Sequence, residues 1–406
     1  MRILLLTQWF DPEPTIKGLT FAKELIKLGH EVQVLTGYPN YPGGEIYPGY
    51  RVKMLQKENI EGISIFRVPL YPSHNSSSVK RILNYISFAI SASLLGPFLV
   101  KPVDIVYVYH PPATIAIPAI IFKMLRNIPC VYDIQDIWPD TLTATGMISN
   151  KLLLWCINIW CLIAYKMVDH IVVLSPGFKK ILHDRGVSSD KISVIYNWCD
   201  EANIAPMSQL DALQSEPQLV GRFNVVFAGT MGKAQSLEVI LDAAEILAIK
   251  LSHVQFVFVG GGIEVEHLKQ KAIDNQINNV IFLPRRHASE ISSLLCAADA
   301  LLVHLKDDPL FEITVPSKTQ TYLAMGRPII MALRGDAADL IERAGAGLVC
   351  QPGNVTSIVS AVEALIGMSS CGRDELGKSG AHFYENELSV QEGSRKFELI
   401  FRKLVE

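Results

Sequence analysis

The amino-acid sequence predicts an α/β protein with two doubly wound domains, each built on a parallel sheet. Short runs of apolar and β-branched residues alternate with longer helical stretches, as in parallel strands that helices cover on both faces. A chain of 406 residues is too long for one ordinary core, so two domains of about 200 residues are expected. Its 49% hydrophobic and 19% charged residues are typical of a globular protein.

Six strands are predicted in each half of the chain. In the first half they are Ile3–Thr7, Val32–Thr36, Ser64–Val68, Ile105–Tyr109, Cys130–Asp133 and Ile171–Ser175. In the second half they are Asn224–Ala228, Gln255–Gly260, Val280–Leu283, Ala300–Val303, Pro328–Met331 and Gly347–Cys350. Each half should form its own sheet, and two such sheets facing each other would bind ligands in a central cleft at the carboxyl ends of their strands.

The expected domains are residues 1–200 and 201–388, followed by a last helix within 389–406. The polar segment Glu201–Gly221 has no strand pattern, and we interpret it as the linker between the domains. The last helix, at about Val390–Glu406, is expected to pack back on either domain.

The charge is unevenly distributed along the chain. Residues 1–200 hold 19 Lys and Arg against 15 Asp and Glu, whereas residues 201–406 hold 18 against 25. A basic first half suits an acidic partner such as an anionic membrane surface, phosphate or pyrophosphate, and no pattern suggests nucleic acid. The seven cysteines form no C-x-x-C pair, which favours reduced thiols in a cytosolic protein and no zinc site or disulfide framework.

Two apolar segments raise the question of membrane contact. Ile82–Val100 is 19 residues long without a charge and is flanked by Lys80, Arg81 and Lys101, and Leu152–Tyr165 is a shorter uncharged segment. Polar residues and a Gly-Pro pair inside the longer segment disfavour a membrane-spanning helix. Two interpretations are left open: core helices, or helices that lie on a membrane surface.

Glycine-rich turns in the second half are candidate phosphate sites. Gly229, Thr230, Gly232 and Lys233 follow a predicted strand and precede a helical pattern, so that backbone N–H groups and a lysine can meet an anion. The turn is no P-loop, and its alternative interpretation is a tight turn with a solvated lysine. A second glycine turn, Gly260–Gly262 (with Gly261 in its centre), follows the next strand.

Three regions of the first half contain candidate polar groups. After the first strand, Gly18 can bring the backbone close to a ligand and Lys17 can meet its phosphates, although an ordinary loop is an equal alternative. After a later strand, Asp133, Asp136, Trp138 and Asp140 gather where a carboxylate can act as a base or hold sugar hydroxyls, unless Asp136 caps the next segment. His110 is a further candidate at a strand end, and a structural role is its alternative.

The segment Pro316–Pro328 points to an anion site by itself. Ser317 is expected to cap a helix whose first turn holds Lys318, Thr319 and Gln320. A lysine is unfavourable at a helix N-terminus, because the helix dipole is positive there. A bound diphosphate would compensate for this mismatch.

In these motifs the chain resembles the family 4 glycosyltransferases of the two-Rossmann (GT-B) type, over nearly its full length. The matching pieces are Ile3–Pro14 with Gly18, Gly29–Thr36 with Pro39–Pro42, Asp136–Asp140, Gly229–Gln235 and Pro316–Pro328. Together they are similar to the branch that builds bacterial surface polysaccharides, and within it to transferases of N-acetyl-L-fucosamine in O-antigen synthesis.

The resemblance implies a metal-independent transfer without a cofactor, from a UDP-sugar such as UDP-N-acetyl-L-fucosamine. The second Rossmann-like domain would hold the nucleotide, with Gly229–Lys233, Pro316 and Lys318 at the diphosphate and Leu283–Arg285 at the base. Within that last segment the expected donor-binding residues are Leu283 and Arg285. The first domain would present a sugar on a polyprenyl diphosphate carrier, with the protein peripheral at the cytoplasmic face of the membrane.

The family's signature is a pair of glutamates eight positions apart, and this chain lacks both. In its register the two positions hold Ile313 and Thr321. Glu312 is expected to take the first role, and Thr321 or Gln320 to bind the ribose. The catalytic candidates are therefore Asp136, Glu312, Lys233 and His110.

Two alternatives to a transferase are kept. UDP-sugar 2-epimerases share the two-Rossmann architecture and would need acids and a histidine to move a sugar proton. A non-catalytic binder of sugar nucleotides would explain the loss of both signature glutamates.

Overall fold

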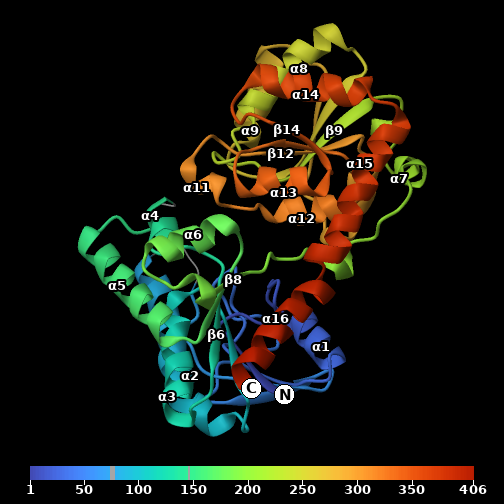
Figure 1. Ribbon diagram of the computed structural model, residues 1–406. Coiled ribbons are helices and arrows are strands. Elements are labelled where there is room, and N and C mark those ends of the chain that lie inside the picture. Colours follow the sequence, from blue (N-terminus) through green and yellow to red (C-terminus); the bar gives the residue numbers. More distant parts are fainter. Residues whose placement is uncertain (74–77, 145–146) are drawn as a thin grey trace. The chain divides into compact units, whose positions relative to one another are not determined.

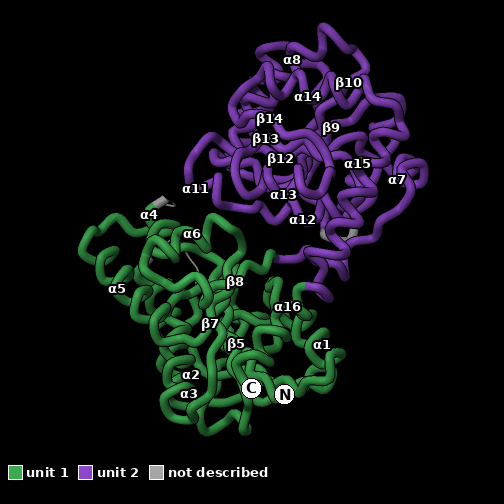
Figure 2. Tube along the Cα trace, viewed as in Figure 1, with its two compact units in different colours: residues 1–196, 393–406 green, residues 197–392 purple. Residues whose placement is uncertain are grey.

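The computed structural model describes residues 1–73, 78–144 and 147–406 of the chain (Figure 1). These residues form two compact units, unit 1 made of residues 1–196 and 393–406 and unit 2 of residues 197–392 (Figure 2). The boundary expected at residues 200–201 thus lies at 196–197. Most of the last helix, from residue 393 onward, belongs to unit 1.

Unit 1 is built on an eight-stranded sheet with the order β3-β4-β2-β1-β5-β6-β7-β8. The strands are β1 Arg2–Thr7, β2 Glu31–Thr36, β3 Gln56–Ile60, β4 Ile63–Arg67, β5 Ile105–Tyr109, β6 Cys130–Ile134, β7 His170–Val173 and β8 Ile192–Val194. All neighbours pair in parallel except β3, which is antiparallel to β4. From β4 to β7 this is the doubly wound order 3-2-1-4-5-6, whose switch point lies between β1 and β5.

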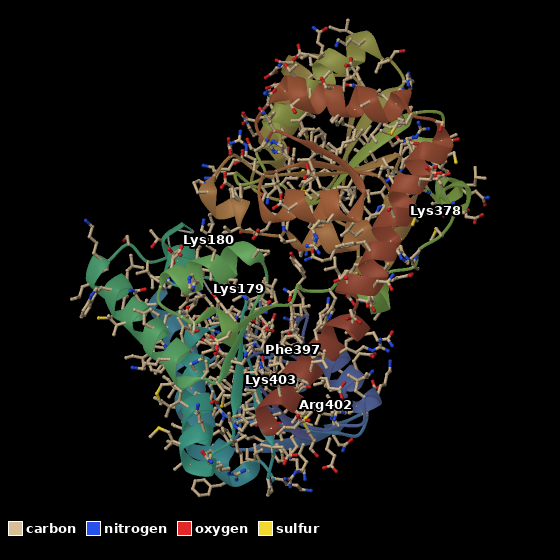
Figure 3. All side chains as sticks on the ribbon, viewed as in Figure 1. Lys179, Lys180, Lys378, Phe397, Arg402 and Lys403 are labelled. Carbon is tan, nitrogen blue, oxygen red and sulfur yellow. The ribbon has the colours of Figure 1, made fainter. Side chains whose placement is uncertain are left out.

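Helices cover both faces of this sheet. They are α1 Leu19–Lys27, α2 Ser78–Leu99, α3 Ala116–Arg126, α4 Asp140–Ala144, α5 Lys151–Met167, α6 Pro176–Asp184 and α16 Val390–Val405, with short helices at Ala113–Ile115 and Ser189–Lys191. Helices α2, α3 and α5 pack side by side in one layer (Figure 1). Figure 3 labels Phe397 on α16. Its ring packs against Phe21 of α1 and Tyr107 of β5, with ring centroids 5.2 and 5.3 Å away. The end of the chain is thereby part of the core of unit 1.

Unit 2 has a six-stranded parallel sheet with the order β11-β10-β9-β12-β13-β14, again 3-2-1-4-5-6. Its strands are β9 Phe223–Thr230, β10 Val254–Gly261, β11 Val280–Leu283, β12 Ala300–His304, β13 Ile329–Ala332 and β14 Gly347–Cys350. Its helices are α7 Gln209–Ser215, α8 Glu238–Lys250, α9 Val265–Asp274, α10 Ala288–Ala297, α11 Pro309–Glu312, α12 Ser317–Ala324, α13 Asp336–Ala344, α14 Val355–Gly367 and α15 Ser370–Phe383, with short helices at Glu201–Asn203, Pro217–Leu219 and Tyr384–Leu388.

The predicted α/β class with two doubly wound domains is confirmed, and each predicted strand is present within two residues at either end. Two strands were missed. Strand β3 lies at the sheet edge, so its residues are mostly polar and partly exposed, and its sequence lacks an apolar run. Strand β8 is only three residues long. The linker interpretation of Glu201–Gly221 is wrong. Its helix α7 packs against α10, and Glu216, only 2% exposed, forms an ion pair with Arg286.

The long apolar segment of unit 1 forms most of helix α2. Its residues Val79–Leu99 are long and apolar enough to cross a membrane, but half of the tested window is buried inside the protein. The bent pair Val355–Gly367 and Ser370–Val405 passes the same test when it is taken as one span. Buried core helices of soluble proteins reach the same length and hydropathy.

Candidate active site

The switch point of unit 2 lies where β9 and β12 end, the place where open α/β sheets bind ligands. Two glycine turns meet there. Gly229 at the end of β9 pairs with Gly260 at the end of β10, and Thr230 pairs with Gly261. A Cβ on Gly260 would lie 2.0 Å from the carbonyl oxygen of Gly229, and one on Gly262 would lie 2.1 Å from that of Met231. Both glycines have positive φ, so the close approach of the turns requires them.

Helix α12 presents Lys318 to these turns. The hydroxyl of Tyr322 accepts a hydrogen bond of 2.8 Å from the N–H of Ala228, which fixes α12 against the end of β9. Lys318, in the first turn of α12, then places its Nζ 3.5 Å from the centre of the Phe227 ring. The same atom is 3.2 Å from where a Cβ on Gly229 would lie. A side chain at position 229 would therefore displace this ammonium group.

The ammonium of Lys318 is buried, and among the described residues its Nζ has no hydrogen-bond partner. Burial lowers its pKa from 10.5 to about 7. The hydroxyl of Thr319, the next residue, is likewise buried without a partner in the part of the chain that the structure describes. Buried polar groups are almost always paired, and an unpaired buried lysine costs stability. An anion bound at the glycine turns would supply the missing partner. This agrees with the expectation from the sequence that a bound diphosphate compensates for Lys318 at the helix N-terminus.

Other details of this helix differ from the prediction. The N-cap position is Pro316, and the helix begins at Ser317, whose side chain makes no capping bond. The predicted Ser317 cap is thus wrong, because a first-turn hydroxyl stands one residue too far into the helix. Gln320 is 2% exposed, and its side-chain nitrogen can donate to the carbonyls of Pro316 and Ser317 at 3.0 Å. Gln320 therefore stabilises its own helix turn, while Thr321 is half-buried one residue further on.

The remaining predicted donor residues lie at the same sheet edge. Gly232 donates its N–H to Gln235 at 3.0 Å, in the turn that leads to α8. Lys233 is exposed in this turn, five positions before α8 begins. Leu283 is the last residue of β11, and Arg285 is exposed two residues later. The structure thus places the glycine turns next to Lys318, whereas the side chains of Lys233 and Arg285 are exposed.

Glu312 is exposed at the end of the short helix α11. Its backbone lies tightly against Gly335, where a Cβ would come within 2.0 Å of the Glu312 carbonyl oxygen. Gly335, Arg334 and Cys350 line a cavity of about 470 Å³ at the ends of β13 and β14. None of the predicted donor residues lines this cavity.

In unit 1, the predicted ligand contacts of Lys17 and Asp133 are wrong. The two side chains are fully buried and form an ion pair, with Lys17 Nζ 2.6 Å from Asp133 Oδ2. The Tyr107 hydroxyl donates to the same oxygen at 2.5 Å, and Phe397 of α16 places its ring 5.0 Å from Lys17 Nζ. These groups satisfy one another inside the core, so neither charge is presented to a ligand.

Gly18 also has a structural role. A Cβ at this position would lie 2.3 Å from Oδ2 of Asp11. The same oxygen accepts a 2.7 Å hydrogen bond from the N–H of Leu19 and thereby caps helix α1. The close approach that we expected for a ligand is thus made by the chain's own carboxylate.

An aromatic cluster at the carboxyl ends of the unit 1 strands was missed, except for Trp138 and His110. Trp9 stacks on Tyr41 at 4.5 Å between ring centroids and lies 6.5 Å from Tyr85. Tyr85 is 6.5 Å from Trp138, which lies 5.5 Å from His110. The five rings come from separate parts of the chain, so no local sequence motif predicts the cluster. Such a surface can pack against the apolar face of a sugar ring.

His110 is the most buried ring of this cluster and is 2% exposed. Burial lowers its pKa to about 3, so its ring is neutral at physiological pH. Nδ1 has no hydrogen-bond partner within the described ranges. A neutral ring with such a low pKa is a poor general base in this state, although it can still donate or accept a hydrogen bond.

The other acidic candidates of this region differ in setting. Asp136 is partly buried, and burial raises its pKa. Asp140 starts helix α4, where it forms an ion pair with Arg185, which also donates to the carbonyl of Trp138 at 2.8 Å. Asp136 therefore stays a candidate base, whereas Asp140 is held by the protein itself.

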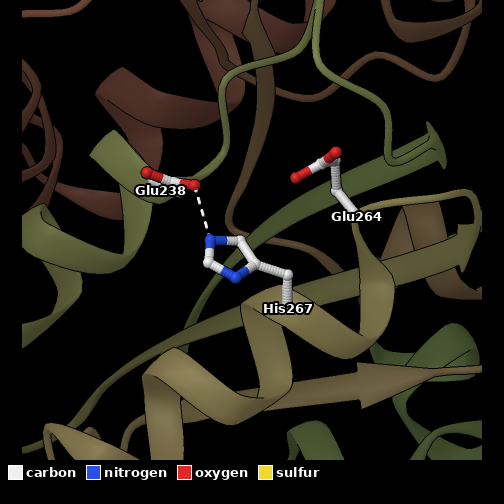
Figure 4. Close-up of side chains that lie close together, drawn as sticks. All are labelled: Glu238, Glu264 and His267. Carbon is white, nitrogen blue, oxygen red and sulfur yellow. Dashed lines mark hydrogen bonds and ion pairs between the residues drawn. The ribbon is translucent and has the colours of Figure 1, made fainter.

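At the starts of α8 and α9, three exposed or half-exposed residues form a candidate cation site. Glu238, Glu264 and His267 bring one ligand atom each to within 4.8 Å of one another (Figure 4). His267 Nε2 is 2.7 Å from Glu238 Oε1. No metal site was expected from the sequence. The spacing of these residues along the chain matches no metal motif, so only the fold brings them together.

Comparison with known proteins gives the family. Residues 19–198 match the family model described as "Glycosyl transferase 4-like domain", and residues 222–368 match "Glycosyl transferases group 1". Between them the two models cover most of the chain. The chain belongs to the glycosyltransferases of the GT-B fold, and it is a transferase.

Two curated proteins are similar to the chain. A protein named as the colanic acid biosynthesis glycosyl transferase WcaI of Escherichia coli is 25% identical over 379 residues, 89% of this chain and 91% of the relative. One named as the glycosyltransferase WbjE of Pseudomonas aeruginosa is 24% identical over 246 residues. That match spans 59% of this chain and 60% of the relative.

Solved structures share the fold over nearly the whole chain. HepE of Anabaena in complex with UDP and glucose has a TM-score of 0.67 at 15% identity, covering 98% of this chain and 99% of that one. WaaG, a glycosyltransferase involved in lipopolysaccharide biosynthesis, has a TM-score of 0.65 at 15% identity, covering 99% of both chains. The predicted resemblance to family 4 glycosyltransferases is confirmed at the level of the family and the fold.

Proposed function

We propose that this glycosyltransferase transfers a sugar from a UDP-sugar to a sugar on a polyprenyl diphosphate carrier, in the synthesis of a bacterial surface polysaccharide. The observation that carries the proposal is the buried ammonium of Lys318 beside the glycine turns of unit 2, which has no hydrogen-bond partner among the residues that the structure describes. The proposed donor is UDP-N-acetyl-L-fucosamine, from the likeness of the sequence motifs. The names of WcaI and WaaG support a role in polysaccharide assembly, and the UDP complexes of HepE support the nucleotide.

The donor diphosphate is proposed to bind between the glycine turns and the first turn of α12. Lys318 supplies a positive charge, and the exposed turn at Gly229 and Thr230 supplies backbone N–H groups. The buried hydroxyl of Thr319 is a further candidate donor. The adjoining end of β11, with Leu283 and the exposed Arg285, is the proposed contact for the base.

In the proposed reaction, the anomeric C–O bond to the diphosphate breaks as the acceptor hydroxyl attacks. Negative charge then grows on the departing UDP, where Lys318 and the N-terminus of α12 stabilise it without a metal or other cofactor. Loss of one such donor typically raises the barrier by about 2.7–4 kcal/mol. Asp136, whose pKa is raised by burial, is the proposed acceptor-side base.

The acceptor is proposed to bind unit 1. Its aromatic cluster offers flat apolar surfaces for sugar rings, with the half-buried Trp9 and Trp138 as the main contacts and the buried Tyr85 packed between them. A carrier lipid would bring the protein to the cytoplasmic face of the membrane. The outward apolar residues of α2, of which Phe98 is 87% exposed, support such a peripheral location.

A donor screen tests the function. The protein is incubated with UDP-sugars and a synthetic lipid-linked N-acetylhexosamine, and NMR of the product gives the anomeric configuration. We expect transfer from UDP-N-acetyl-L-fucosamine with release of UDP. A new UDP-sugar isomer formed without any acceptor would instead identify an epimerase and contradict the proposal.

A further inference from the structure

Unit 1 contains an apolar groove beside helix α2. Its volume is about 380 Å³, and its lining includes Met54, Leu70, Ser87, Ile90 and Leu94. Small-molecule sites typically measure ~300–1,000 Å³. The groove is therefore large enough to hold part of a ligand.

The polar groups in the lining are already used by the protein. The hydroxyl of Ser91 donates to the carbonyl of Pro69 at 2.5 Å, and that of Ser87 donates to the carbonyl of Asn84 at 2.9 Å. Since the other lining side chains are apolar, the groove offers a ligand hydrocarbon contacts. Its outer wall is Met54, a flexible side chain that is 71% exposed and can adapt to what it covers.

The groove is continuous with an exposed apolar stripe on α2. The stripe consists of Ile86, Ile90, Leu94 and Phe98, with exposed fractions of 41%, 54%, 65% and 87%. Residues four apart lie on one side of a helix, and Ile90 and Leu94 also line the groove. The neighbouring helices α3 and α5 add exposed apolar residues, among them Met124 and Trp155.

Positive charges flank this apolar surface. Lys80 is exposed in the first turn of α2, and Lys101 is exposed just after the helix ends. Apolar side chains bordered by lysines are typical of helices that lie in the interface of an anionic membrane. Soluble proteins rarely expose such a surface without a use for it.

The same helix reaches the aromatic cluster. Tyr85 belongs to that cluster on the buried face of α2, and Ile90 follows it by five residues, which is about 7.5 Å along the helix axis and roughly 140° around it. Asn84 fixes this end of α2, since its Nδ2 donates to the carbonyl of Tyr71 at 2.7 Å. A hydrocarbon chain attached to a sugar at the aromatic rings would therefore pass over the first turns of α2 to reach the groove on the exposed side of the helix.

We propose that the groove binds the first part of the isoprenoid chain of a lipid-linked acceptor, while the α2 stripe lies in the membrane surface. This deepens the proposed function and rests on it. A single-chain lipid with a sugar headgroup fits both the aromatic cluster and the groove. A phospholipid offers a hydrocarbon chain but no sugar for the rings, so it accounts for only half of the arrangement.

The test measures binding of farnesyl phosphate to the full-length protein by calorimetry, below the concentration at which the lipid forms micelles. Tetradecyl phosphate, with the same headgroup on a straight chain, is the second probe. Met54→Asp places a charge in the groove wall. Met124→Asp on α3 is its matched control, because both methionines are 71% exposed and only Met54 lines the groove.

A second pair of variants keeps the membrane stripe apolar. Ile90→Trp covers the groove, whereas Ile86→Trp enlarges a stripe residue one turn earlier that does not line it. We expect farnesyl phosphate affinity to fall about tenfold or more in Met54→Asp and Ile90→Trp and to stay within about twofold of wild type in both controls. Tetradecyl phosphate should bind the wild type more weakly than farnesyl phosphate.

If Met54→Asp and the wild type bind farnesyl phosphate with equal affinity, the proposal that the groove binds the isoprenoid chain is wrong. It is also wrong if the wild type shows no measurable affinity for farnesyl phosphate. If the wild type binds tetradecyl phosphate more tightly than farnesyl phosphate, the groove binds a straight acyl chain, and the proposal of an isoprenoid ligand is wrong. UDP binding by the same samples separates this failure from a failure of the proposed function. A wild type that binds no UDP contradicts the function, whatever the groove binds.

Discussion

The ammonium of Lys318 lies 3.5 Å from the centre of the Phe227 ring and, among the described residues, donates to no acceptor. The electron-rich ring face gives this charge a weak partner, but not the oxygen that a buried ammonium requires. Two distant segments, the end of β9 and the start of α12, therefore hold a positive charge ready for an anion. The arrangement lowers stability in the ligand-free protein and favours binding.

Lys318→Met should separate these two effects. UDP affinity should fall about 10- to 100-fold, because a charge-assisted bond to the diphosphate is lost. The ligand-free protein should become more stable by roughly 1–3 kcal/mol, since a desolvated charge is removed. Calorimetry with UDP and chemical denaturation check the two effects. A variant that is destabilised and still binds UDP with wild-type affinity would mean that Lys318 is a structural residue.

UDP affinity should depend on pH through Lys318. Its pKa is about 7 in the free protein, and a bound diphosphate should raise it. Binding then takes up a proton above pH 7, so affinity should be highest below about pH 7 and fall by up to tenfold per pH unit above it. Titrations in buffers of different ionisation enthalpy measure this uptake. Lys318→Met is the control, and the decline above pH 7 should disappear in it.

The same shift affects folding, with the following sign. The pKa of Lys318 is lowered in the folded protein from 10.5 to about 7, so the unfolded chain binds more protons between these values. Stability of the ligand-free protein should therefore rise with pH above about 7, relative to Lys318→Met. The difference is measured by urea denaturation of both proteins at pH 6.5 and about pH 9. A constant difference would contradict the lowered pKa.

Gly260→Ala should disrupt the contact between the two glycine turns. The new Cβ would lie 2.0 Å from the carbonyl oxygen of Gly229, at a residue with φ of +140°. We expect a loss of about 2 kcal/mol or more in stability together with loss of UDP binding. Gly261→Ala is the neighbouring control, since in the described part of the chain no atom other than those of its chain neighbours lies within 4 Å of its Cβ position. Equal effects of the two substitutions would refute the role of the close contact.

The buried pair of Lys17 and Asp133 should behave as a unit. Lys17→Met leaves Asp133 charged in the core and should cost about 3–5 kcal/mol. Adding Asp133→Asn should restore part of this stability, because the amide oxygen can still accept from Tyr107 without a buried charge. Denaturant unfolding of the two single variants and the double variant measures the coupling. Additive losses would show that the two charges do not interact.

Membrane binding should depend on the stripe of α2. Phe98→Glu should reduce co-sedimentation with anionic vesicles several-fold, because it places a charge where the helix would enter the lipid. Ile249→Glu in unit 2 is a matched control, since both residues are 87% exposed. UDP affinity should be unchanged in both variants. If Phe98→Glu sediments like wild type, α2 is not the membrane-binding helix.

The sheets could be predicted because their strands are continuous apolar runs, the form that strands buried on both faces take. Strand β3 was not predicted, because its residues are mostly polar and lie at the sheet edge, where burial imposes no apolar pattern on the sequence. Lys318 could be predicted from a purely local conflict, a lysine at a helix N-terminus. The helix start was one residue off, and so the Ser317 cap failed.

Contacts across long sequence separations could not be predicted from local patterns. Lys17 and Asp133 are 116 residues apart. Each lies near the end of a strand, and from its local sequence alone each is expected to contact a ligand. The two residues become part of the core because α16 packs on α1 and β5, as the contacts of Phe397 show. The same holds for the aromatic cluster, because its rings come from helix α2 and from loops whose positions only the assembled sheet determines.

The most direct measurement of the central claim is an NMR titration of the Lys318 side chain, in protein labelled on its lysines and assigned with Lys318→Met. We predict a pKa of about 7 without ligand and a rise of at least one unit when UDP is bound. A pKa near 10.5 in the free protein, or one that UDP leaves unchanged, would contradict the proposal that this lysine binds the donor diphosphate.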